Sequence, residues 1–280
     1  VTFRANRDEG VGLVEALPKS KNTLEFNALS DNTLRHDAVV EPRTLDGRAA
    51  VPYVWVSATV ARGTKLTVRP GVRIKFINSA GGLTVDGVLA MEGTAADPVV
   101  ITDLEDDAVG GDTNLDGNDS APRRGGFSFR FRANERDDEN VIRHTRIAYG
   151  GYSGGTNSVV QFEDASGLLE DVTIEQANTN AVRVLGSADP TLRRVRMLNL
   201  DGFPVTMAPF SNPTFEDNDA LNVAGIALWL ESDEVEVDVT FPQRSFLGYD
   251  NIAYVLDCNS RITVRSGATL TIPAGTVFKA

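Results

Sequence analysis

Residues 190–194 read PTLRR and residues 213–217 read PTFED, so the second Pro-Thr-apolar group follows the first by 23 residues (213 − 190 = 23). In the same frame, Val182 and Val184 precede the first group as Val205 and Met207 precede the second. Apolar positions that return every twenty-odd residues indicate coils that stack on one another and bury a continuous apolar column.

The period extends upstream of these groups. Leu169 lies 23 residues before Leu192, and a further step of 27 residues reaches Ile142. Between residues 50 and 280, apolar residues also alternate with polar ones in short runs, as in 127–132 (FSFRFR), a pattern typical of strands with one dry face. A propeller would need about forty residues per blade. We therefore predict an all-β, right-handed parallel β-helix (β-solenoid) with coils of about 23–27 residues.

A longer repeat suggests a modular organisation. Residues 63–71 (GTKLTVRPG) are similar to residues 267–275 (GATLTIPAG), 204 positions later (267 − 63 = 204). We expect one module over 51–250, interrupted by an Asp/Asn/Gly-rich insertion at 103–125. Residues 1–50 would be the tail of a preceding module or an N-terminal cap, and 251–280 the start of the next module. Neighbouring modules, or identical subunits placed end to end as a filament, are the expected partners.

The amino-acid composition narrows the classes of function that this chain can have. The chain has 280 residues with 27 Lys and Arg against 39 Asp and Glu, and a formal net charge of -12. This acidic balance argues against a nucleic-acid partner and suits an extracellular protein that binds cations. The single cysteine, Cys258, excludes an intrachain disulfide. No apolar run reaches the roughly 18 residues that a membrane span requires, so none is expected in this segment.

Several segments together resemble the right-handed parallel β-helix modules of large secreted bacterial surface proteins, which have a pectate-lyase-like fold. The resemblance covers about residues 50–280. It is carried by 63–76 (GTKLTVRPGVRIKF), 82–102 (GLTVDGVLAMEGTAADPVVIT), 106–117 (DDAVGGDTNLDG), 142–151 (IRHTRIAYGG) and 213–218 (PTFEDN). It implies an extracellular or cell-surface location and a role as scaffold or adhesin. Because the fold carries both lyases and non-enzymatic adhesins, it leaves the activity open.

The insertion contains a candidate calcium site. Its sequence at 112–118 (DTNLDGN) places side-chain oxygens at alternate positions and a glycine in the turn, the D-x-N-x-D-G pattern of loops that wrap Ca²⁺. Arg123 takes the position of the bidentate Glu of an EF-hand, so neighbouring acidic residues would complete the site. The predicted ligands are Asp112, Asn114, Asp116, Asn118, Asp106 and Asp107, with Asp103 and Asp119 as further candidates. The alternative is a metal-free surface turn of the kind that Asn, Asp and Gly form.

Charged pairs recur at the 23-residue spacing: Glu170-Asp171, Arg193-Arg194 and Glu216-Asp217. We interpret them as an outward ladder of alternating sign, which stabilises modestly and keeps the outer face soluble.

The alternative to this ladder is a carbohydrate-active groove, either a polysaccharide lyase or hydrolase or a glycan-binding module. Tyr149, Tyr152 and the Gly-rich run 150–155 are candidates for an aromatic platform in such a module. His36, His144 and Cys258 are too isolated to suggest a metal centre or a catalytic triad. We therefore predict no catalytic residue.

Overall fold

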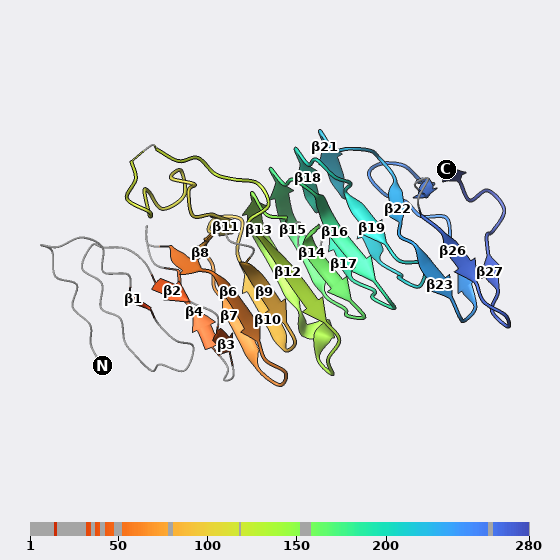
Figure 1. Ribbon diagram of the computed structural model, residues 1–280, viewed down its shortest axis with the longest axis horizontal. Coiled ribbons are helices and arrows are strands. Elements are labelled where there is room, and N and C mark those ends of the chain that lie inside the picture. The colour runs from red at the N-terminus through yellow and green to blue at the C-terminus, as the bar shows by residue number, and fades with distance from the viewer. Residues whose placement is uncertain are drawn as a thin grey trace, which may run out of the picture.

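The computed structural model describes residues 14–15, 32–34, 37–39, 43–47, 52–77, 81–117, 119–151, 158–256 and 260–279. Over this part of the chain the protein is a parallel β-solenoid of about 9 turns, with one short 3-10 helix, η1 (Asp137–Glu139). Figure 1 shows the coils stacked along the long axis of the molecule. The all-β, stacked parallel architecture predicted from the sequence is confirmed.

Two large sheets form the walls of the column. In the described residues, the larger sheet has fourteen strands: β1 (Val14–Glu15), β2 (Asn32–Leu34), β4 (Arg43–Leu45), β5 (Tyr53–Trp55), β7 (Lys65–Val68), β8 (Arg73–Phe76), β10 (Val88–Glu92), β11 (Val99–Asp103), β13 (Val141–Ala148), β15 (Leu168–Glu175), β17 (Thr191–Arg193), β18 (Arg196–Leu198), β20 (Thr214–Glu216) and β21 (Asp219–Leu221). The ten-stranded sheet, on the same basis, has β3 (Asp37–Val39), β6 (Ser57–Val60), β9 (Gly81–Val85), β12 (Phe127–Arg132), β14 (Ser158–Glu163), β16 (Asn180–Leu185), β19 (Val205–Met207), β22 (Leu228–Leu230), β25 (Tyr254–Leu256) and β28 (Phe278–Lys279).

Two small sheets follow the end of the larger one. They pair β23 (Asp233–Val235) with β26 (Ile262–Val264), and β24 (Val239–Thr240) with β27 (Leu270–Thr271). The ten-stranded sheet continues past the module boundary predicted between residues 250 and 251, because β22 pairs with β25 and β25 pairs with β28. The predicted division into modules at these positions stays a prediction, and much of the segment 1–50 lies outside the described residues.

The register between coils follows the repeat read from the sequence. Ile142 pairs with Leu169, Leu169 with Leu192, and Leu192 with Phe215. On the other sheet, β16 pairs with β19 in the register of the predicted 23-residue step. Residues separated by one coil therefore lie directly against one another in a parallel ladder, as the spacing predicted.

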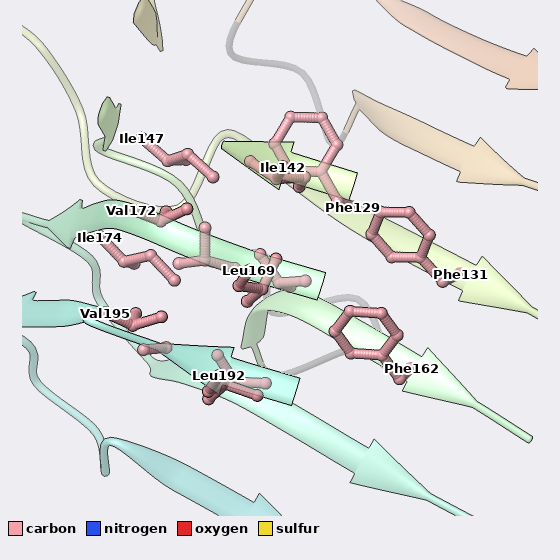
Figure 2. Close-up of a cluster of buried hydrophobic side chains, with 14 of the residues drawn as sticks. Phe129, Phe131, Ile142, Ile147, Phe162, Leu169, Val172, Ile174, Leu192 and Val195 are labelled. Carbon is pink, nitrogen blue, oxygen red and sulfur yellow. The ribbon is translucent and has the colours of Figure 1, made fainter. Parts of the chain in front are cut away.

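The apolar columns meet between the two sheets. Figure 2 shows Phe129, Phe131 and Phe162 of the ten-stranded sheet facing Leu169 and neighbouring aliphatic side chains of the larger sheet. These side chains are at most 1% exposed, and the rings of Phe131 and Phe162 stack with centroids 4.8 Å apart. Burial of each such side chain contributes about 1.5–3 kcal/mol before the entropic cost of ordering the chain.

Left-handed residues other than glycine mark two corners of successive coils. The first column comprises His144, Asp171, Arg194 and Asp217, with φ between 42° and 54°. The second comprises Tyr149, Gln176, Asn199 and Asn222, with φ between 54° and 64°. Asn and Asp adopt this conformation more readily than most residues, whereas Arg and Tyr are held in it by the coil.

Buried asparagine side chains that directly precede a strand bond the backbone of a neighbouring coil. Asn218 accepts a hydrogen bond from the Val195 N–H (2.8 Å) and donates one to the Leu192 carbonyl oxygen (3.0 Å). Asn140 likewise accepts from the Leu89 N–H (2.9 Å). These side chains satisfy backbone groups where the regular ladder bends.

Candidate functional site

The insertion between β11 and β12 stands out from the column as the yellow-green loop of Figure 1, and polar contacts at both of its ends anchor it. Lys75 on β8 is fully buried, and its ammonium group donates to the carbonyl oxygens of Gly111 (2.8 Å) and Leu104 (3.4 Å). At the other end of the insertion, Arg124 binds the Asp201 carboxylate (2.8 Å) and the Gln176 side chain (2.6 Å). The loop is thus fixed to several coils.

Three carboxylates of the insertion converge. Asp107, Asp112 and Asp116 each place one oxygen within 4.8 Å of the others. The Asp112 carboxylate also accepts hydrogen bonds from the backbone N–H groups of Asp116 (3.2 Å) and Gly117 (2.9 Å), which close the turn. Oxygens bound to one Ca²⁺ at about 2.3–2.6 Å lie within about 5 Å of one another, so this spacing fits a shared divalent cation.

Buried oxygens without a hydrogen-bond partner occur in the same cluster. Within the described part of the chain, Asp107 Oδ1, Asn114 Oδ1 and Asp116 Oδ1 are shielded from solvent and accept no hydrogen bond. Asn114 Nδ2 donates to Asp116 Oδ2 (2.8 Å). A buried acceptor without a partner costs about 1–3 kcal/mol, and more when it is charged. A cation held by these oxygens would remove that cost, so the side chains present fit Ca²⁺.

The structure places the other predicted ligands differently. Asp106 is buried and accepts a hydrogen bond from the Thr102 hydroxyl (2.6 Å), and it does not belong to the converging trio. Asp103 is fully buried, accepts from the Glu105 N–H (2.9 Å), and has its pKa raised to about 6 by desolvation. Asp119 is exposed. Asn118 lies outside the described residues.

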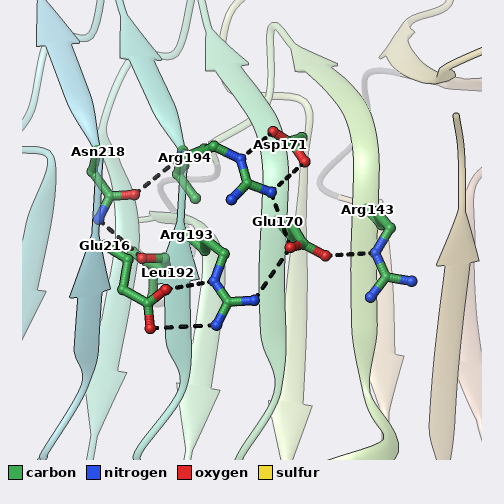
Figure 3. A network of polar contacts seen from close by, with 9 residues as sticks. Arg143, Glu170, Asp171, Leu192, Arg193, Arg194, Glu216 and Asn218 are labelled. Atoms are coloured by element: carbon green, nitrogen blue, oxygen red, sulfur yellow. Dashed lines mark hydrogen bonds and ion pairs between the residues drawn. The ribbon is translucent and has the colours of Figure 1, made fainter. Parts of the chain in front are cut away.

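A ladder of ion pairs crosses the larger sheet. Figure 3 shows Arg143, Glu170, Arg193 and Glu216 in one line over neighbouring strands. Glu170 accepts from Arg143 (2.6 Å) and from Arg193 (3.3 Å), and Arg193 reaches on to Glu216 (2.5 Å). The outward ladder of alternating sign predicted for these positions is confirmed, and it begins one coil earlier, at Arg143.

A second pair runs beside this line, because Arg194 forms a two-point contact with Asp171 at 2.7 and 2.8 Å. Hydrogen bonds from these arginines lower the pKa values of the carboxyl groups. The pKa of Glu170 is lowered chiefly by Arg143, that of Asp171 by Arg194, and that of Glu216 by Arg193. These carboxylates therefore stay ionised at neutral pH. A general acid needs the opposite shift, so the arrangement suits an ion-pair lattice.

The remaining candidates of the sequence analysis do not form a common site among the described residues. His144 lies at a corner, with Nε2 3.8 Å from a carboxylate oxygen of Asp171. Tyr149 is also a corner residue, and desolvation raises the pKa of its hydroxyl. Tyr152, His36 and Cys258 fall outside the part of the chain that the structure describes.

One surface feature was not predicted from the sequence. Phe203 and Trp229 stack on the outer side of the ten-stranded sheet, with ring centroids 4.0 Å apart. They line a hollow of about 370 Å³ together with Thr206, Arg183 and Glu231. The available signal was Trp229 at the outward position of the strand 228–230 (LWL), where a polar side chain is usual.

No protein-family model, curated protein or solved structure gave a significant match to this chain. A search of the described residues for a helix of sufficient length and apolarity to cross a bilayer found none.

Proposed function

We propose that this chain is a non-catalytic structural or adhesive β-solenoid module of an extracellular or cell-surface protein, stabilised by Ca²⁺ in its insertion. The proposal rests on a contrast: carboxylates of the ladder face arginines of neighbouring coils, whereas three carboxylates of the insertion face one another. The first arrangement balances its own charges, and the second is one that a shared cation would stabilise. Such a role agrees with what the resemblance to β-helix repeats of secreted bacterial surface proteins implies.

Calcium is the cation that the donor set favours. The ligands would be Asp107, Asp112, Asn114 and Asp116, all of which offer oxygen. Oxygen-only sites on a loop suit Ca²⁺, which accepts irregular geometry, better than Zn²⁺, which prefers nitrogen and sulfur ligands. Extracellular modules bind Ca²⁺ with dissociation constants of about 10⁻⁴–10⁻³ M, which fits the proposed location. Its role would be structural, in fixing the insertion against the column.

End-to-end association is the remaining part of the proposal. Exposed large apolar side chains gather in the C-terminal coils, where Leu221, Val237, Val264 and Ile272 are between 44% and 61% exposed. Contact with a neighbouring module or with an identical subunit would cover such side chains. This arrangement supports a longer array or a head-to-tail filament.

Calorimetry with and without metal tests the calcium part. We expect Ca²⁺ to bind wild-type protein and to raise its melting temperature, and EDTA to reverse the effect. A protein with the same melting temperature in both conditions would overturn the calcium proposal.

Incubation with a panel of acidic and neutral polysaccharides tests the non-catalytic part, because release of unsaturated or reducing sugars would overturn it. Sedimentation velocity at increasing protein concentration tests association. A protein that stays monomeric up to millimolar concentration would overturn the filament.

A further inference from the structure

An outward-facing row on the ten-stranded sheet contains a hollow. Arg183, Thr206 and Trp229 lie in register on β16, β19 and β22. The guanidinium group of Arg183 binds the Glu231 carboxylate through two hydrogen bonds, both of 2.5 Å. Thr206 is short and its neighbours in the row are long, and all three residues line a hollow of about 370 Å³. That volume lies within the range of about 300–1,000 Å³ of small-molecule sites.

Aromatic surface forms one wall of the hollow. Phe203 and Trp229 stack at an interplanar angle of 15°, and both are only partly buried. Trp55, by contrast, is fully buried in the core. A partly exposed aromatic pair beside polar groups offers a flat apolar face to a ligand while its neighbours offer hydrogen bonds.

A buried hydroxyl group lines the same hollow. Thr206 is 2% exposed, and its Oγ1 finds no hydrogen-bond partner in the described residues. Burial of a hydroxyl group without a partner costs free energy, so a polar ligand that reached Oγ1 would gain a hydrogen bond. The unpaired Thr206 Oγ1 distinguishes the hollow from an ordinary gap between surface side chains.

The charges around the hollow define the class of ligand. Arg183 and Glu231 neutralise each other across it, with side chains 19% and 22% exposed. The polar wall also includes Ser232 and Ser260. A ligand with a net charge would compete with the ion pair, whereas a neutral ligand with many hydroxyl groups and one apolar face would not.

We propose that this hollow binds a neutral pyranose ring of a glycan. The C–H face of the sugar lies against the aromatic wall, and its hydroxyl groups bond Thr206 Oγ1 and the outer oxygens of Glu231 and Ser232. Binding breaks no covalent bond and needs no metal. The inference goes beyond the structural role proposed above and is independent of the calcium site, which lies on the insertion.

Tryptophan fluorescence gives a direct test, because the chain has two tryptophans and Trp55 is fully buried. The full chain is titrated in EDTA with methyl β-D-glucopyranoside, methyl β-D-galactopyranoside and cellobiose, and with galacturonic acid as the charged comparison. We expect a saturable signal with at least one neutral sugar, with Kd on the order of 1 mM, and none with the uronic acid.

Two variants and a control assign the binding to the hollow. Trp229→Ala removes half of the aromatic wall, and we expect it to abolish binding as measured by saturation-transfer NMR. Thr206→Val replaces the hydroxyl group with a methyl group of similar size. We expect about fivefold weaker binding with an unchanged or higher melting temperature, because no hydrogen bond among the described residues is lost. Tyr249→Ala removes an exposed aromatic ring elsewhere and should bind as wild type does.

Three results would overturn the proposal. These are no response to any neutral sugar, a preference for the uronic acid, or Thr206→Val binding as tightly as wild type. The second variant keeps the test decisive if Trp229→Ala fails to fold. None of these outcomes bears on the metal dependence of the melting temperature, so failure here is distinguishable from failure of the calcium proposal.

Discussion

The ladder on the larger sheet and the loop of the insertion use the same acidic residue types with opposite results. On the ladder, Glu170 is in contact with three arginines: Arg143, Arg193 and Arg194. In the loop, the carboxylates of Asp107, Asp112 and Asp116 face one another, and in the described residues none of them forms an ion pair with Lys or Arg within 4.0 Å.

The difference follows from the backbone. Stacked strands place residues one coil apart side by side, so opposite charges at the coil spacing meet automatically. A loop outside the repeat has no such neighbour, and its acidic groups converge only through local turns such as the one that Asp112 closes. Acidic residues in the repeat therefore serve the column itself, whereas the converging trio of the insertion would depend on an added cation under the calcium proposal.

The largest expected effect is that of the proposed Ca²⁺ on the melting temperature. Wild-type protein in EDTA should melt roughly 5–10 °C below the same protein with Ca²⁺ at a hundredfold excess over Kd, since ligand binding at that level contributes about 2.7 kcal/mol. Differential scanning calorimetry measures the shift. Magnesium at equal concentration is the control and should restore less, because Mg²⁺ demands tighter octahedral geometry.

The second prediction compares the loop and the ladder by the same substitution, Asp to Asn, in each. Asp116→Asn should weaken Ca²⁺ binding at least about tenfold, yet in EDTA it should melt no lower than wild type, because it removes one of three mutually repelling charges. Asp171→Asn on the ladder should melt lower than wild type in both conditions. Isothermal titration and calorimetry on both variants measure this. If both variants changed Ca²⁺ affinity and melting temperature in the same way, the distinction between loop and ladder would be contradicted.

The coil repeat and the ladder were predictable because both depend on spacing alone. Once Leu169, Leu192 and Phe215 are known to stack, the charges at the adjacent positions must meet. The convergence of acidic side chains in the loop was predictable from the sequence, but which of them converge was not. Asp106 turns to Thr102, and Lys75, at a strand position that pattern reading assigns to solvent, is buried under the insertion.

The corner columns were not predicted. Left-handed corners are usually read from glycine, and here they fall on residues such as Arg194 and Gln176, which signal no turn. The repeated Asn199 and Asn222, bonded to each other at 3.0 Å, were the available signal at the coil spacing. The aromatic hollow was missed for another reason: Phe203 and Trp229 are 26 residues apart, and only the coil geometry brings their rings together.

A smaller effect tests whether the ladder acts as a network. Glu170→Gln leaves three arginines around a neutral amide, and we expect a melting temperature roughly 2–4 °C below wild type. The difference should shrink in 1 M NaCl, because salt screens partly exposed ion pairs. Glu139→Gln, which removes exposed pairs with Arg136 and Lys65, is the control and should change little. A Glu170→Gln protein as stable as wild type at low salt would show that the ladder contributes nothing.

The smallest effect is the pH dependence of that same difference. Arginine contacts lower the pKa of Glu170 below its ordinary value of 4.5, so the folded chain binds fewer protons than the unfolded chain at acid pH. The stabilisation by Glu170 is therefore present above about pH 4.5 and is lost as the pH falls through the lowered pKa. Calorimetry between pH 7 and 2.5 should show the wild-type and Glu170→Gln melting temperatures converging at the acid end. If the gap stays constant over this range, Glu170 acts through its shape and not through its charge, and the contrast between ladder and loop loses its electrostatic basis.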